Sequence, residues 1–437
     1  MNIFAWISAI GIIVFSFFPL LNKETRTKST IFKAVFNTVV VLSMIFAVTV
    51  LHVPLFPALI VMLVAIFIVD VKWTWKKGLT FTGIIIAIVG GAAYILLKED
   101  PDYVVKHLEK YPENSSFIFA KNGEALVSYS ADARRPLAST VKIIIAIEYA
   151  KQLAAGDLHE DELVPVEDLD KFYLKDTDGG AHPAWLEEME KENRIQKRQV
   201  SLHDVAKGMI KYSSNANTDY LIALLGLESI NETLESLDLK GHEAIYPLVG
   251  SVLVPYKVQE NTNEKMSDDA LIEKLTNMTT EEYHDISVDI LAEIESGEID
   301  ISKIDYDKPL DLQRVWSDRL PGATAKDYEQ LLHTINENKL FSEEENAYIR
   351  ELLEWPMQIK GNEERFTHFG GKGGSTAFVL NQAMYAEDHE GNTYEIILFT
   401  DDLTLWQGFQ MGKNHNEFLR KMFDDPGYWE KVQERLK

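Results

Sequence analysis

The sequence at residues 139–146 is Ser139-Thr140-Val141-Lys142-Ile143-Ile144-Ile145-Ala146. Residues 137–153 are apolar at helical spacing, and the Ser/Thr pair can cap the start of that helix. On a helix, residues i and i+3 share a face with Cβ atoms about 5–6 Å apart, so Lys142 Nζ can reach Ser139 Oγ. The apolar flank favours burial of Lys142, which lowers the pKa of this lysine and makes it a candidate base for a serine nucleophile.

An S-x-x-K pattern is expected about once by chance in a chain of this length, so it needs support from other segments. Residues 213–215 (Ser-Ser-Asn) follow an apolar helix, and their hydroxyl and carboxamide groups can relay a proton and bind a substrate amide. Residues 370–375 (Gly-Gly-Lys-Gly-Gly-Ser) stand at a strand start, where glycines let the backbone approach a substrate and Lys372 offers a charge for a carboxylate. The alternative is a glycine-rich bulge with a solvated lysine.

Strand and helix signals around these segments indicate an α+β domain. Two apolar runs, 116–121 and 125–130, are joined by Asn122-Gly123, which is a strong hairpin signal. Helical patterns dominate to about residue 235, and three strands are expected after residue 366, followed by a closing helix at 413–436. This order predicts an antiparallel sheet built from both ends of the domain, with a helical subdomain inserted between them. An acidic stretch at about 257–310 is interpreted as a solvated insertion of helices and loops, in preference to a separate functional module.

Together the three segments resemble the motifs of the penicillin-recognising serine enzymes, and residues 98–437 resemble a class A β-lactamase-like domain. The resemblance implies an α/β (α+β) fold of the β-lactamase/DD-peptidase type and an acyl-enzyme mechanism with no cofactor and no metal. It implies that Ser139 is the nucleophile, Lys142 its base and Ser213 the proton relay. The substrate-binding residues that it implies are Asn215, Lys372, Gly374 and Ser375, and the backbone N–H groups of Ser139 and Ser375 would form the oxyanion hole.

The chain departs from this family pattern at two points. Class A β-lactamases use a loop Glu to activate the water that releases the acyl-enzyme, and the E-x-x-x-N pattern is missing where it is expected. Glu243 lies in that region without the pattern, and Glu273 has the letters but lies further along the chain. Gly373 replaces the hydroxyl residue usual at the centre of the third motif, which removes a donor to a substrate carboxylate. His182 and Trp185 either line the cleft or form a buried structural pair.

Residues 1–97 form a basic, apolar head. Four apolar runs, at about 3–21, 33–51, 55–71 and 79–97, each approach the roughly 20 residues that span a bilayer as a helix. The links at 22–32 and 72–78 carry Lys and Arg, which places them on the cytoplasmic side. We therefore expect a multi-pass membrane region, with residues 98–437 outside the cytoplasm.

Charge and composition exclude several classes of function. Residues 1–97 hold seven Lys or Arg and two Asp or Glu, whereas the rest of the chain holds 36 and 66. Such an acidic body repels nucleic acid, so no nucleic-acid partner is expected. The chain has no cysteine, and its histidines show no H-E-x-x-H pair, so a metal site has no support. The expected partners are a lipid bilayer and a small-molecule or peptidoglycan-like substrate.

These inferences predict a membrane-anchored serine hydrolase that acts through an acyl-enzyme on a β-lactam or on a cell-wall-related amide or ester. The alternative is a β-lactam sensor or penicillin-binding protein that is acylated and deacylates slowly. Because the cytoplasmic links are short, a sensor of this kind would need a partner to supply its output.

Overall fold

The computed structural model describes residues 98–260, 266–304 and 309–437, with 262 and 306, and, nearer the N-terminus, 17, 20, 26–49, 61 and 62. The chain divides into two compact units, Met1–Lys98 and Glu99–Lys437. The expected spans at about 3–21, 55–71 and 79–97 lie almost wholly outside the described residues. The remaining expected span, 33–51, overlaps helix α2 (Lys28–Thr49).

Helix α2 is the one helix among the described residues that is long and apolar enough to cross a membrane, by length and composition alone. Several of its apolar side chains are exposed, including Val35, Val39 and Leu42. One such helix fits either a span or a signal anchor. It does not establish the four-span arrangement that the sequence predicts.

The second unit is built on a five-stranded antiparallel sheet in the order β2-β1-β9-β8-β7. The hairpin expected around Asn122-Gly123 is present, and the C-terminal strands complete the sheet from the other end of the domain, as predicted. The strands are β1 (Ser115–Lys121), β2 (Glu124–Tyr129), β7 (Phe366–Ser375), β8 (Leu380–Asp388) and β9 (Thr393–Thr400).

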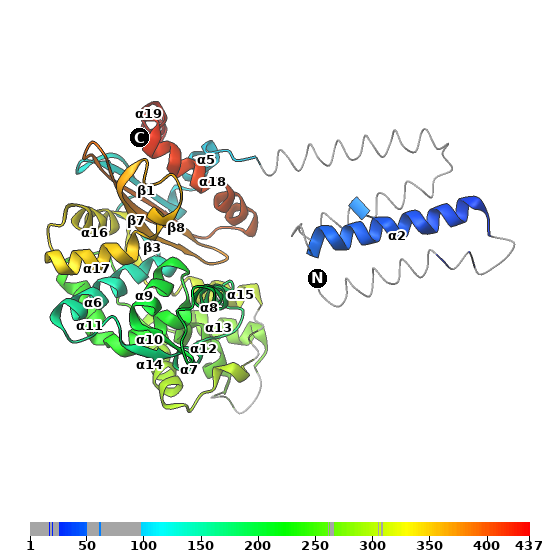
Figure 1. Ribbon diagram of the computed structural model, residues 1–437, viewed down its shortest axis with the longest axis horizontal. Helices are drawn as coiled ribbons and strands as arrows, with labels where there is room; N and C mark the ends of the chain where they lie inside the picture. The colour runs from blue at the N-terminus through cyan, green and yellow to red at the C-terminus, as the bar shows by residue number, and fades with distance from the viewer. Residues whose placement is uncertain are drawn as a thin grey trace. The chain divides into compact units, whose positions relative to one another are not determined.

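Both faces of the sheet are buried, because alternate side chains along its central strands enter different hydrophobic clusters. Phe117 and Phe119 of β1 pack on one side, and Ile118 on the other. Figure 1 shows α5, α18 and α19 along one face and α16 and α17 on the other. Their bounds are α5 (Asp102–Lys110), α16 (Ala325–Glu337), α17 (Glu343–Leu353), α18 (Leu405–Asp424) and α19 (Pro426–Arg435).

The single closing helix expected at 413–436 is therefore two helices. Asp425 leaves the helical conformation between them and caps α19, and Pro426, which lacks a backbone N–H, occupies the first position of α19.

A helical subdomain lies beside the sheet (Figure 1), as the sequence predicts. Its core helices are η3 (Ala138–Val141), α6 (Lys142–Ala155), α7 (Val166–Asp170), α8 (Ala181–Lys191), α9 (Leu202–Lys211), α10 (Asn215–Leu225) and α11 (Leu227–Ser236). Two short antiparallel strand pairs accompany these helices. In one, β3 (Arg134–Pro136) pairs with β6 (Gly322–Thr324), and in the other, β4 (Leu163–Pro165) pairs with β5 (Gln199–Ser201).

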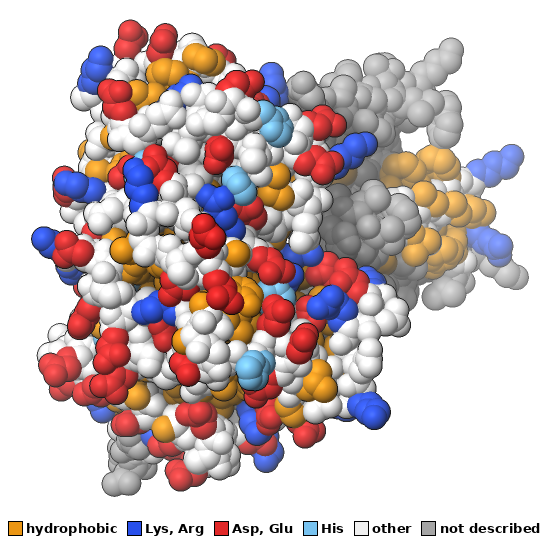
Figure 2. Space-filling view, turned by 60° about the vertical axis from the view of Figure 1, so that its left-hand side comes forward, with side chains coloured by type: hydrophobic (Ala, Val, Ile, Leu, Met, Phe, Trp, Pro, Cys, Tyr) orange, Lys and Arg blue, Asp and Glu red, His pale blue; other side chains and the backbone are white. Residues whose placement is uncertain are grey.

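The acidic insertion at about 257–310 contains α13 (Asp268–Asn277) and α14 (Thr280–Ser296), and α12 (Leu248–Glu260) and α15 (Leu310–Ser317) flank it. Buried residues such as Leu253, Tyr283 and Ile290 join these helices to the main hydrophobic core of the domain. Asp and Glu side chains are scattered across the face of the domain shown in Figure 2, so the acidity lies on the surface and the apolar residues point inward.

Candidate active site

Ser139 lies in the 3₁₀ turn η3, three residues before α6 begins at Lys142. The chain enters this turn through Ala138, whose φ of 47° is in the left-handed region that non-glycine residues rarely occupy. Asn381 of β8 holds the approach, because its side-chain amide donates to Pro136 O at 2.7 Å and to Leu137 O at 3.1 Å. A half-buried serine is thus fixed at the start of a buried helix.

Strand β7 packs directly on this turn, and Gly374 makes the contact possible. A Cβ atom at Gly374 would lie 2.4 Å from Leu137 O and 2.7 Å from Thr140 Oγ1, closer than real side chains approach. Glycine is therefore required here for the approach of two backbones. This close approach sets the Lys372–Ser375 end of β7 beside Ser139.

Lys142 is fully buried beneath the site. Its Nζ donates to Ser213 O at 2.7 Å, to Ser213 Oγ at 3.2 Å and to Asn215 Oδ1 at 2.9 Å. Burial first, and then the positive charge of Lys372, hold the pKa of Lys142 well below its usual range. The sequence predicted contact between Lys142 and Ser139, whereas the hydrogen bonds in the described part of the chain join Lys142 to Ser213 and Asn215.

Lys372 is the second buried amine of the site. Its Nζ donates to Gly373 O at 2.8 Å, and burial lowers the pKa of Lys372 to about 7. On the neighbouring strand Gln382 pairs with Gly373, so this edge of the site offers a neutral amide opposite a residue without a side chain.

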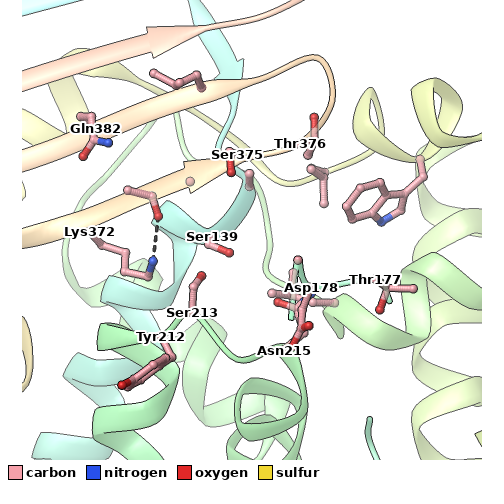
Figure 3. Close-up of a pocket in the computed structure, with 18 of the residues that line it drawn as sticks. Ser139, Thr177, Asp178, Tyr212, Ser213, Asn215, Lys372, Ser375, Thr376 and Gln382 are labelled. Atoms are coloured by element: carbon pink, nitrogen blue, oxygen red, sulfur yellow. Dashed lines mark hydrogen bonds between the residues drawn. The ribbon is translucent and has the colours of Figure 1, made fainter. Parts of the chain in front are cut away.

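The candidate residues surround one cavity of about 550 Å³ (Figure 3). The hydroxyl groups of Ser139 and Ser213 and the side chain of Lys372 point into the same space, and Asp178 and Asn215 lie across from them. Lys142 does not line the cavity but contacts Ser213 and Asn215, which do. The lining consists of Ala138, Ser139, Thr177, Asp178, Gly179, Tyr212, Ser213, Asn215, Leu248, Trp316, Leu320, Lys372, Gly373, Gly374, Ser375, Thr376, Leu380, Gln382 and His415.

The helices α12 and α15, which flank the acidic insertion, supply an apolar wall of this cavity that the sequence did not predict. Leu248 begins α12, and Trp316 near the end of α15 donates from Nε1 to Ser251 Oγ at 2.9 Å. The buried carboxylate of Asp219 fixes the start of α12, since it accepts the backbone N–H groups of residues 248, 249 and 250 at 2.8, 2.7 and 3.3 Å. Burial raises the pKa of Asp219 to about 6, against the lowering effect of these three hydrogen bonds.

His182 and Trp185 form a buried pair and do not line the cavity. His182 Nδ1 lies 3.1 Å from Ser214 Oγ and 3.2 Å from Asn217 Oδ1. These contacts tie α8 to the turn that carries Ser213, whose φ of 66° is also left-handed. Of the two alternatives that the sequence left open, the structure supports the structural pair.

Neither Glu considered as a water-activating residue lines the cavity. Glu243 accepts from Arg134 Nη1 at 2.8 Å and from the backbone N–H of Gly322 at 2.8 Å. Glu273 is exposed on α13. Asp178 is the one carboxylate among the described lining residues, and it accepts the N–H groups of residues 180, 181 and 182 at the start of α8.

Replacing Glu243 with Ala is expected to lower the free energy of unfolding by about 1–3 kcal/mol, because the buried N–H of Gly322 loses its acceptor. Urea unfolding measures this change, and Glu273→Ala serves as an exposed control. Covalent modification of Ser139 should persist in both variants. If Glu243→Ala kept its stability but lost turnover, Glu243 would belong to the chemistry and not to the scaffold.

Among the described residues there is no group of three or more His, Cys, Asp or Glu side chains arranged to hold a metal ion. The polar groups that line the cavity include serine and threonine hydroxyls, the Lys372 amine and the carboxamides of Asn215 and Gln382, and the Lys142 amine contacts Ser213 and Asn215 behind them. This set can activate a serine hydroxyl and bind a carbonyl oxygen.

Comparison with solved structures finds similar chains among β-lactamases. One from Sphaerobacter thermophilus DSM 20745 is 17% identical, with a TM-score of 0.45, over 75% of this chain and 98% of that one. One from Chitinophaga pinensis DSM 2588 is 14% identical, with a TM-score of 0.45, over 74% and 98%. The structure named PBP-A is 12% identical, with a TM-score of 0.42, over 72% and 95%. A search of curated proteins found no match.

The sequence model of the beta-lactamase enzyme family matches residues 102–422, and the chain belongs to this family. The match covers the sheet, the helical subdomain and the helices of the insertion.

Proposed function

We propose that the protein is an active-site serine hydrolase that acts through an acyl-enzyme on a β-lactam or a cell-wall-related amide or ester. The observation that carries the proposal is the buried Lys142, which contacts Ser213 Oγ at 3.2 Å below a cavity that Ser139 and Ser213 line. An amine with a strongly lowered pKa can accept a proton near neutral pH, which an ordinary lysine does not.

In the proposed reaction, Ser139 Oγ attacks the substrate carbonyl carbon and gives its proton to the neutral Lys142 amine, directly or through Ser213 Oγ. The backbone N–H groups of Ser139 and Ser375 stabilise the oxyanion. The carbonyl–nitrogen or carbonyl–oxygen bond then breaks, and the leaving atom takes the proton back through Ser213. Asn215 keeps its side-chain NH₂ for a substrate amide, because its Oδ1 is bound to Lys142.

An acylated protein that deacylates slowly is the second candidate. It is favoured by the absence of a free carboxylate among the described lining residues, since Asp178 is held by three backbone N–H groups. The apolar wall of Leu248, Trp316 and Leu320 also offers no base for a water molecule. Acylation is therefore better supported than hydrolysis of the acyl-enzyme.

The proposal includes anchoring to a cell membrane with residues 98–437 outside the cytoplasm. Supporting it are the apolar helix α2 and the apolar, basic composition of residues 1–97. The multi-pass arrangement is the sequence-based part of the proposal. Flotation of the chain with liposomes, and protease accessibility of residues 98–437 in sealed cells, test it.

Intact-mass measurement of the detergent-solubilised chain after exposure to a penicillin, a chromogenic cephalosporin and an activated ester tests the catalytic proposal. A persistent adduct on Ser139 would favour the slow-deacylating form, and rapid turnover would favour a β-lactamase. Acylation by the ester alone would exclude the β-lactam part. The proposal as a whole requires that Ser139→Ala lose every adduct.

Lys372 gives the proposed site a pH dependence. Its pKa of about 7 means that the charged form dominates at pH 6 and the neutral form at pH 8. The KM of a substrate bearing a carboxylate is therefore expected to rise as the pH increases from 6 to 8, because the attraction to Lys372 is lost. A neutral ester, assayed in parallel, should show no such rise. Equal behaviour of the two substrates would remove Lys372 from carboxylate binding.

A further inference from the structure

An exposed apolar patch opens helix α18. Leu405 is 59% exposed, Trp406 57% and Phe409 49%. Phe409 is four residues from Leu405 and three from Trp406, spacings that bring side chains together on a helix surface, and the rings of Trp406 and Phe409 stack with centroids 5.6 Å apart. Within residues 98–437, as far as the structure describes them, every other exposed large apolar side chain stands alone in the sequence. Such clustering marks an interaction surface.

The chain enters the domain on the same helix. The backbone N–H of Asp100 donates to Asn414 Oδ1 at 2.7 Å, and α5, which follows, packs beside α18 (Figure 1). Asn414 lies five residues beyond Phe409, or about 7.5 Å along the helix at 1.5 Å per residue. The entry point and the patch therefore share one rigid element.

The segment before this entry point is apolar from residue 79 to residue 97. If it ends at the bilayer surface, the three residues that lead to Asp100 can reach at most about 11 Å. That limit keeps Asn414, and with it the beginning of α18, close to lipid. This step rests on the proposed membrane anchoring.

Charge around the patch also fits a bilayer surface. Lys413 is the one Lys, Arg, Asp or Glu in residues 405–416, the part of the sequence that holds the patch, whereas residues 98–437 as a whole carry 36 Lys or Arg and 66 Asp or Glu. Asp401 and Asp402 precede this part, so the strongly acidic character of the domain stops at the start of the helix. Trp and Phe are the residues that membrane interfaces favour, because their rings lie at the level of the headgroups.

We propose that Leu405, Trp406 and Phe409 insert into the interface of the lipid bilayer and hold the domain against it. His415 on the same helix lines the cavity, so this contact also fixes the distance of the active site from the membrane. The active site would then meet substrates at the membrane surface in a fixed orientation. The tether before Asp100 alone would leave the orientation of the domain free.

The absence of cysteine from the chain permits a direct test. Phe409→Cys introduces a single thiol for a nitroxide spin label, and the full chain is reconstituted into phosphatidylcholine–phosphatidylglycerol liposomes. Accessibility to oxygen, which concentrates in lipid, is compared with accessibility to a water-soluble nickel chelate. Leu340→Cys and Ile359→Cys, at residues 57% and 51% exposed, are the matched controls. We expect oxygen to be favoured at position 409 and the nickel chelate at both controls.

Two results would overturn the proposal while leaving anchoring intact. One is a label at position 409 that is as water-accessible as the controls in a chain that still floats with the liposomes. The other is a label shielded from both reagents, which would mean that protein covers the patch. A chain that does not float would overturn the anchoring and the patch together. Trp406→Cys repeats the measurement should Phe409→Cys fail to fold.

Discussion

Lys142→Met is expected to slow acylation of Ser139 by about 10²–10⁴-fold, the usual contribution of a general base. Methionine keeps a long buried side chain in place of Lys142 but cannot accept the proton of Ser139. The loss should appear in the rate of adduct formation, followed by intact mass. In the native chain this rate should rise with pH as Lys142 becomes neutral, and because burial lowers the pKa of Lys142, the rise falls below the pH range of an ordinary lysine.

The variant also leaves Ser213 O and Asn215 Oδ1 without their donor, so stability must be measured beside the rate. Lys326→Met, at an exposed lysine paired with Asp132, is the control for loss of a positive charge. A folded Lys142→Met protein that kept its acylation rate and its pH profile would show that another group takes the proton.

Gly374→Ala should damage the site and the fold together. Its Cβ would lie 2.4 Å from Leu137 O and 2.8 Å from Thr140 N, so β7 must move away from η3. Overpacking of this kind costs about 1–3 kcal/mol of stability. A displacement near 1 Å between Ser139 and the oxyanion-binding strand lowers the acylation rate by about 10²-fold.

The neighbouring glycine supplies a matched control. A Cβ at Gly373 meets the end of the Gln382 side chain at 3.0 Å, and that side chain can turn aside. Gly373→Ala should therefore stay close to the native chain in urea unfolding and lose less of the acylation rate than Gly374→Ala. Equal losses in the two variants would mean that the glycine run matters for strand flexibility and not for contact with η3.

Local signals predicted much of the sheet. The Asn122-Gly123 turn identified the first hairpin, and apolar runs identified the last three strands, because these features depend on neighbours in the sequence. The serine segment was also visible, since it starts an apolar helix. The conformation of this segment could not be predicted in detail. Ser139 lies in a 3₁₀ turn before α6, and the Lys142 side chain extends toward Ser213.

The far wall of the cavity could not be predicted from the sequence. Leu248, Trp316 and Leu320 lie in or beside apolar stretches that are typical of a hydrophobic core, and only tertiary packing brings them into the cavity that Ser139 lines. Asp219 is one of 68 acidic residues, and its partners lie 29 to 31 positions away in the sequence. Contacts of this range depend on tertiary structure, which residue patterns do not encode locally.

The pairing of β1 with β9 has a consequence for synthesis. Residues 115–121 align with residues 394–400, and β9 is the central strand of the sheet. The ribosome makes the two edge-side strands β2 and β1 early and the strand that joins them to β8 almost last. The edge of β1 that faces β9 therefore stays unpaired until the chain is nearly complete. Pairing of strands so far apart in the sequence is slow. A chain that ends before residue 393 would lack the strand that joins the β1–β2 pair to the β7–β8 pair.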